Sequence, residues 1–166
     1  PESNREFYKP DSADFHKSDK VIELQWLLTE ILNNKDIRLN LVASVCAIEF
    51  CSYETQKFLH TLDAVELSKV FISGTLKDGR MLFAPIPNFI FTRDIGIMIK
   101  DHILLSRMAT TARKRESLIT KCLAMYFLFK EDTSKVMEVI EDSDFFLYEE
   151  VERKARFISI EGGDIM

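Results

Sequence analysis

The chain has 166 residues, 46% of them hydrophobic and 30% charged, a composition typical of one globular domain or slightly more. Its formal net charge of −5 argues against a nucleic-acid-binding domain, because such domains usually carry a basic face. No apolar run approaches the roughly 18 to 20 residues that a membrane-spanning helix needs. The three cysteines, Cys46, Cys51 and Cys122, form neither a metal-like pair nor an even disulfide set, which favours free thiols in a reducing cytosol.

The first 73 residues divide into a polar segment and a helical segment. Residues 1–18 are weakly patterned, and we expect a loop or the remnant of a first structural module. Residues 19–73 predict a compact unit of four helices, because apolar residues recur at helical spacing and the connections are short. The predicted helix starts are Asp36, Ser52 and a capping-box-like pair of Asp63 with Glu66.

After Gly74 the pattern changes to short strands mixed with helices. Residues 81–83 and 89–91 are apolar runs of strand length, and residues 95–99 and 103–105 predict a tight hairpin. A helix is expected from Thr110 or Thr111 to about Phe129, a second helix over 133–142, and a strand over 156–160. The order of strands and helix from 88 to 160 predicts a ββαβ unit that needs neighbouring units to cover it.

Residues 85–94 form the most informative segment, the run PIPNFIFTRD. Two prolines stiffen the approach to an apolar stretch, and the run ends on Asp94. One interpretation is structural, namely a salt bridge or turn at the end of a strand. The other is a positioned carboxylate that accepts two hydrogen bonds from a planar guanidinium.

Arg113 follows Asp94 by 19 residues, within the run TARKRE over 111–116. It lies near the start of a predicted helix, where a positive charge opposes the helix dipole. Such local inconsistencies are expected at functional sites. Two interpretations remain open: a solvated face shared with Lys114 and Arg115, or a clamp for a substrate carboxylate.

The run IEGGD over 160–164 is the third segment. Two glycines after a strand permit a sharp turn or a close backbone approach. The segment is either an ordinary polar turn or a way to place Glu161 at a strand end beside a pocket. The histidines are scattered, Cys46 and Cys51 lie in an apolar helical context that favours buried inert thiols, and neither a phosphate loop nor a metal cluster is evident.

Taken together and in this order, the three segments resemble the arginine deiminase family of the guanidino-group-modifying (amidinotransferase) superfamily. The resemblance is less sharp over residues 20–73, which are similar to the α-helical insertion of bacterial deiminases. It implies an α/β fold, part of a five-bladed propeller of ββαβ modules with an inserted helical bundle. The corresponding domains are the remnant at 1–18, the inserted helical domain at 19–73 and the propeller modules at 74–166.

The resemblance also implies a chemistry. Enzymes of this family hydrolyse L-arginine to L-citrulline and ammonia without a metal or an organic cofactor. A cysteine thiolate attacks the guanidinium carbon to give a thiouronium-type intermediate, and a histidine then activates water. Carried over by motif, Asp94 and Glu161 are the catalytic carboxylates that hold the guanidinium. Arg113 and Asn88 bind the substrate α-carboxylate, and Phe91 packs along the aliphatic part of the substrate.

In that family the catalytic histidine and the nucleophilic cysteine lie downstream of the segment that contains Glu161. No cysteine of this sequence stands in a matching context, so we expect the polypeptide alone to have no deiminase activity. An isolated part of a propeller would expose open strand edges, which favours association into homo-oligomers. Two alternatives stay open: another superfamily member, such as an amidinotransferase or a dimethylarginine hydrolase, or a non-catalytic interaction module with an acidic surface.

Overall fold

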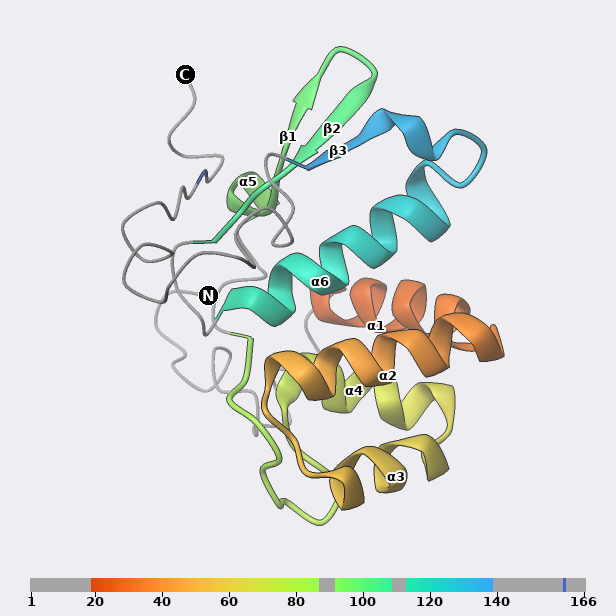
Figure 1. Ribbon diagram of the computed structural model, residues 1–166, viewed down its shortest axis with the longest axis vertical. Coiled ribbons are helices and arrows are strands. Elements are labelled where there is room, and N and C mark those ends of the chain that lie inside the picture. Colours follow the sequence, from red (N-terminus) through yellow and green to blue (C-terminus); the bar gives the residue numbers. More distant parts are fainter. Residues whose placement is uncertain (1–18, 87–91, 109–112, 139–159, 161–166) are drawn as a thin grey trace, which may run out of the picture. The chain divides into compact units, whose positions relative to one another are not determined.

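The computed structural model describes residues 19–86, 92–108, 113–138 and 160, and the chain divides into two compact units, Pro1–Ile90 and Phe91–Met166 (Figure 1). The described part of the first unit is built from four helices. The described part of the second holds a small sheet with short and long helices. The chain therefore has mixed helix and sheet content, while the propeller and the domain boundary after residue 73 stay predictions.

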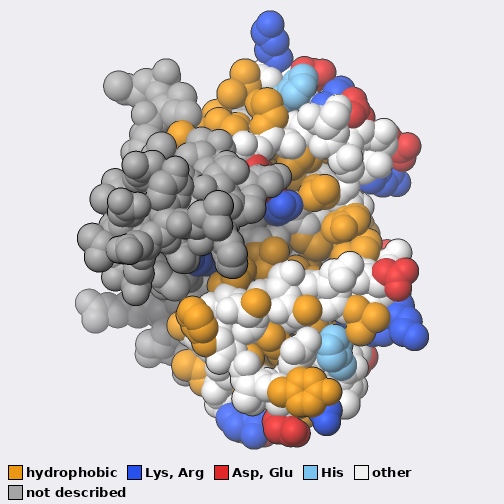
Figure 2. All heavy atoms as spheres, in the orientation of Figure 1, with side chains coloured by type: hydrophobic (Ala, Val, Ile, Leu, Met, Phe, Trp, Pro, Cys, Tyr) orange, Lys and Arg blue, Asp and Glu red, His pale blue; other side chains and the backbone are white. Residues whose placement is uncertain are grey.

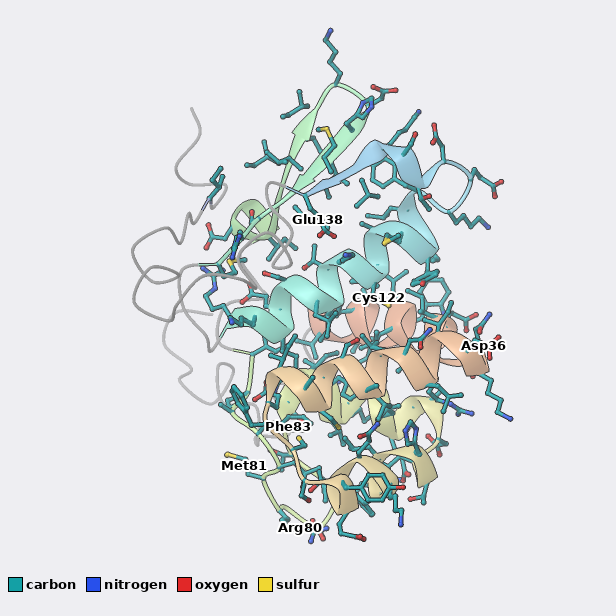
Figure 3. All side chains as sticks on the ribbon, viewed as in Figure 1. Asp36, Arg80, Met81, Phe83, Cys122 and Glu138 are labelled. Carbon is teal, nitrogen blue, oxygen red and sulfur yellow. The ribbon has the colours of Figure 1, made fainter. Side chains whose placement is uncertain are left out.

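The four predicted helices of the first unit are confirmed. They are α1 (Asp19–Leu32), α2 (Lys35–Ile48), α3 (Tyr53–Thr61) and α4 (Ala64–Ser73). Ser52 caps α3 by accepting the Thr55 N–H, and Asp63 caps α4 by accepting the Glu66 N–H at 2.8 Å. The prediction that Asp36 caps α2 is wrong. The side chain of Asn34 accepts the N–H groups of Asp36 and Ile37, so Asn34 is the cap. Asp36 lies in the first turn of α2, where Figure 3 labels it. Asn34 is the cap because it directly precedes α2 and has the extended backbone that a cap requires.

Apolar side chains on the inner faces of these helices form the core of the first unit. Helix α1 packs closely on α4, and Thr29 donates a hydrogen bond to Ser68 across their interface at 3.0 Å. The fully buried apolar residues of this core include Leu28, Leu32, Val42, Val45, Leu59, Leu67, Phe71 and Ile72. The outer faces carry charged side chains of both signs beside exposed hydrophobic ones (Figure 2).

A loop returns along the end of α4. Gly74 ends that helix in a left-handed conformation with φ +73°, and its carbonyl accepts the Leu82 N–H at 2.8 Å. Residues 81–83 do not form the predicted strand, since Met81 makes only an isolated bridge to Thr75. Figure 3 shows Met81 and Phe83 on this loop; Phe83 is buried, whereas Met81 is exposed.

Phe50 offers a test of backbone strain at the end of α2. It has a φ of +53°, which L-residues avoid, and its side chain is 88% exposed, so little apolar burial would be lost on its removal. We expect Phe50→Gly to raise the free energy of unfolding by about 1 kcal/mol, because glycine adopts this conformation without strain. Urea denaturation measures the change. Glu49→Gly, at a residue with φ −89°, should give no gain, and an equal gain in both variants would contradict the strain argument.

The second unit contains a ββαβ arrangement. After the short helix α5 (Thr92–Ile95), strand β1 (Gly96–Ile99) pairs antiparallel with β2 (His102–Leu105). Helix α6 (Lys114–Leu123) follows and continues into a π-helix, η4 (Ala124–Leu128). Strand β3 (Val136–Glu138) then pairs in parallel with β2, which gives the sheet order β1-β2-β3. Ile103 and Leu105 of β2 pack with Ala124, Phe129 and Val136, so the sheet is covered by the end of the helical segment.

The helix predicted over 133–142 is wrong over 133–138. A 3-10 turn, η5 (Thr133–Lys135), leads directly into β3. The sequence predicts a helix because Val136, Val139 and Ile140 have helical spacing. The strand forms because the edge of β2 supplies hydrogen-bonding partners for an extended backbone, and because β-branched valine suits a strand. Lys121 of α6 forms an ion pair with Glu138, labelled at the end of β3 in Figure 3. The strand predicted over 156–160 lies outside the described residues except for Ile160.

Candidate functional site

Asp94 is positioned by the short helix that precedes the sheet. It lies in α5, and its side chain is 31% exposed. The next residue, Ile95, accepts the Ser106 N–H at 3.3 Å, which ties this segment to the end of β2. Asp94 is therefore a partly accessible carboxylate held at one end of the sheet.

Arg113 meets Asp94 at that position. It is the residue that precedes α6, with φ −98° and ψ 0°, and its side chain is 9% exposed. One of its terminal nitrogens, Nη2, lies 3.5 Å from Oδ2 of Asp94. The two residues that sequence reasoning singled out are thus brought together, as an ion pair of long, weak geometry.

Glu116 is the residue that sequence reasoning missed. Its carboxylate is completely buried and accepts two hydrogen bonds from the Arg113 guanidinium, from Nε at 3.1 Å and from Nη2 at 3.0 Å. This two-point pairing fixes the plane of the guanidinium. It also explains how a cation is tolerated at the start of α6, because the opposing charge lies in the first turn of the same helix. The three-residue spacing from Arg113 was the available signal.

The interpretation of residues 113–115 as a solvated face is wrong. Arg113 and Arg115 are buried, at 8% and 1% exposure, and only Lys114 is exposed. Burying a charge is costly unless the charge is paired, so buried arginines indicate that opposite charges lie beside them. Asp94, Arg113 and Glu116 form that cluster in the second unit.

The other predicted site residues, Asn88, Phe91 and Glu161, lie outside the described residues. The residue before Glu161 is described, however. Ile160 pairs with Arg107, donating its N–H at 3.1 Å and accepting the Arg107 N–H at 2.9 Å. Arg107 directly follows Ser106, which bonds the residue after Asp94, so Ile160 joins the end of the sheet near which Asp94 lies.

Two cysteines have the properties of inert thiols. Burial raises the pKa of Cys122 to about 12, and burial together with the neighbouring Cys51 raises that of Cys46 to about 12. Both remain protonated near neutral pH and are poor nucleophiles. Cys122 lies on α6 (Figure 3). Cys51 is half-buried in the connection between α2 and α3, so the expectation of a buried helical thiol is wrong for Cys51. Among the described residues, no group of three or more His, Cys, Asp or Glu side chains could hold a metal ion.

Comparison with known proteins decides the family. A family model described as arginine deiminase matches residues 62–166, more than half of the chain. The chain belongs to the arginine deiminase family. An arginine deiminase from Mycobacterium marinum (strain ATCC BAA-535 / M) is similar as well, with 28% identity over 124 residues. The matched region covers 61% of this chain and 31% of that relative, so the chain spans about a third of the length of the curated protein it matches.

The family match covers the whole ββαβ unit and all three motif segments. It therefore confirms the family that the motifs at 85–94, 111–116 and 160–164 predict. None of the helices in the described part of the chain has the length and apolar character that a bilayer crossing requires.

Proposed function

We propose that this chain forms part of the substrate site of a hydrolase that converts L-arginine and water to L-citrulline and ammonia. The observation that supports this most directly is the contact between Asp94 and a guanidinium, that of Arg113, in a cluster whose net charge is negative. Asp94, Arg113 and Glu116 together carry one surplus negative charge, which complements a cationic guanidinium ligand.

In the proposed site, Asp94 receives the substrate guanidinium and Arg113 binds the α-carboxylate, with Asn88 beside it. These two substrate groups lie at opposite ends of arginine, so the bound substrate would separate Asp94 from Arg113. Their 3.5 Å contact is the longest of the three that Arg113 makes with these carboxylates. Arg113 is therefore anchored on Glu116, and the Asp94 contact is the one that substrate would replace.

Glu161 is proposed as the second carboxylate for the guanidinium, and Phe91 as the side chain that packs along the substrate methylenes. The pairing of Ile160 with Arg107 supports a place for Glu161 near the Asp94 end of the sheet. The carboxylates orient the guanidinium carbon for attack by a cysteine thiolate, and their charge stabilises the developing transition state. The same proposal includes a thiouronium intermediate in the reaction and a five-bladed propeller as the fold. It also includes a cytoplasmic location and association with further copies of the chain.

Calorimetric titration of the chain with L-arginine tests the site. Asp94→Ala should weaken binding about tenfold or more, because a charge-assisted hydrogen bond contributes about 1.5 to 3 kcal/mol. Asp101→Ala is the matched control, since it removes the same charge from an exposed position of the same unit and should leave the affinity unchanged. An Asp94→Ala variant that is folded and binds arginine as well as the unmodified chain would favour the interaction module instead. A citrulline assay of this chain should show no turnover, because none of Cys46, Cys51 and Cys122 stands in the sequence context of the family's nucleophile.

A further inference from the structure

Two cysteines, Cys46 and Cys51, lie at the two ends of the turn that closes α2 before α3 begins. Glu49 is the C-cap that follows α2, and the next residue, Phe50, has the left-handed conformation with φ +53°. The Cys51 N–H then donates to the Cys46 carbonyl at 2.9 Å. A six-to-one bond of this kind across a left-handed residue is the Schellman motif, which brings the side chains at its two ends into contact.

In this protein both of these side chains are thiols. Neither Cys46 nor Cys51 is in a disulfide, and the neighbouring Cys51 helps to raise the pKa of the Cys46 thiol. Cys46 is buried at 5% exposure, whereas Cys51 is half-buried. A Schellman end more often carries two apolar residues at these positions, so the pair of thiols is chemically distinct from ordinary helix-end packing.

We propose that Cys46 and Cys51 are a modification site that forms a reversible intrachain disulfide with a small-molecule disulfide oxidant of the oxidised-glutathione class. The Cys51 sulfur, the more exposed of the two, attacks the oxidant and releases one glutathione thiol. The Cys46 sulfur then attacks the Cys51 side of the mixed disulfide and releases the second. The two thiol protons pass through solvent to the two departing glutathione thiolates, and two electrons pass from the cysteine pair to the oxidant.

The local structure assigns different roles to the two thiols. Burial and a raised pKa make Cys46 a poor nucleophile toward an oxidant in solution, so it does not react first. Its part is the resolving step, in which its position beside the Cys51 mixed disulfide offsets its small thiolate fraction. Cys122 is excluded as a partner for the oxidant because it is buried and its pKa is likewise raised by desolvation. The disulfide would connect the last turn of α2 to the residue before Ser52, the cap of α3, and would therefore fix the junction of these two helices.

Incubation of the purified chain with oxidised glutathione at neutral pH, followed by intact-mass measurement and peptide mapping, tests the proposal. The expected product has lost the mass of two hydrogen atoms, yields a cross-linked peptide that contains residues 46 and 51, and regains two free thiols on treatment with dithiothreitol. Cys122→Ser should behave in the same way. A stable glutathione adduct on Cys51 without cross-linking, or a cross-link that includes Cys122, would overturn the proposal.

Two single variants separate the roles. Cys46→Ser lacks the resolving thiol, so it should accumulate one glutathione on Cys51. Cys51→Ser should remain unmodified, because its remaining thiols are buried. Circular dichroism of each variant establishes that the helices are retained, and the result on the unmodified chain decides the proposal if a variant does not fold.

Discussion

Replacing Glu116 with alanine should lower the free energy of unfolding of the second unit by about 3 to 5 kcal/mol. The carboxylate of Glu116 is completely buried and holds Arg113, which is itself 92% shielded from solvent, by two hydrogen bonds. Removing one partner leaves the guanidinium buried without its main counter-charge, and this desolvation cost exceeds the net stability of the pair itself. Hydrogen exchange of the α6 amides in urea reports the stability of this unit separately from that of the first.

The matched control is Glu131→Ala. Glu131 also pairs with a cation, Lys130 at 3.9 Å, but its side chain is 89% exposed. An exposed pair contributes less than about 1 kcal/mol, so this variant should be nearly as stable as the unmodified chain. Equal costs for Glu116→Ala and Glu131→Ala would mean that the Arg113–Glu116 pair is not buried in solution.

Gly74→Ala should destabilise the first unit by about 3 kcal/mol, the second large effect that the structure predicts. A Cβ atom at Gly74 would lie 2.0 Å from the Phe83 carbonyl oxygen, a contact with backbone that no rotamer change relieves. The two segments would have to separate, which would weaken the bonds from the Leu82 and Phe83 N–H groups to the Gly74 carbonyl. The left-handed backbone, with φ +73°, adds its own strain. Urea unfolding followed by the fluorescence of Trp26, the single tryptophan, measures the loss.

Gly79→Ala isolates the steric part of that effect. Gly79 has a similar φ of +82°, but a Cβ atom there would meet nothing within 4 Å. Its replacement should therefore cost only the backbone strain, about 1 kcal/mol. If the two variants are equally destabilised, the close approach of Phe83 to Gly74 does not contribute.

The sequence predicts the helices of the first unit well because their signals are local. Ser52, Asp63 and Gly74 end or begin helices through bonds to residues at most four positions away, so the pattern needs no knowledge of the fold. Strand β3 could not be predicted in this way. Val136 takes an extended conformation because β2 offers a free edge, and that edge is set by residues more than 30 positions earlier.

The candidate site shows the same contrast. Asp94 and Arg113 stand out through motifs whose order resembles a family, and the family is confirmed by the match over 62–166. Glu116 stands in an ordinary i, i+3 position, and only the burial of Arg113 shows that its carboxylate holds the cluster together. Burial of a charged group depends on what packs over it, which a single sequence does not state.

The parallel pairing of β3 with β2 also bears on how the chain folds. In the first unit the close packing of α1 on α4 also joins residues far apart in sequence, such as Thr29 and Ser68, which are 39 positions apart. In the second unit the β1–β2 hairpin closes through a tight turn, but the sheet gains its third strand only after the segment between Leu105 and Val136 has returned through α6. That closure costs chain entropy before it yields any strand contact. We therefore expect the β1–β2 hairpin to form before β3 joins it, with the completion of the sheet as the late step in the folding of this unit.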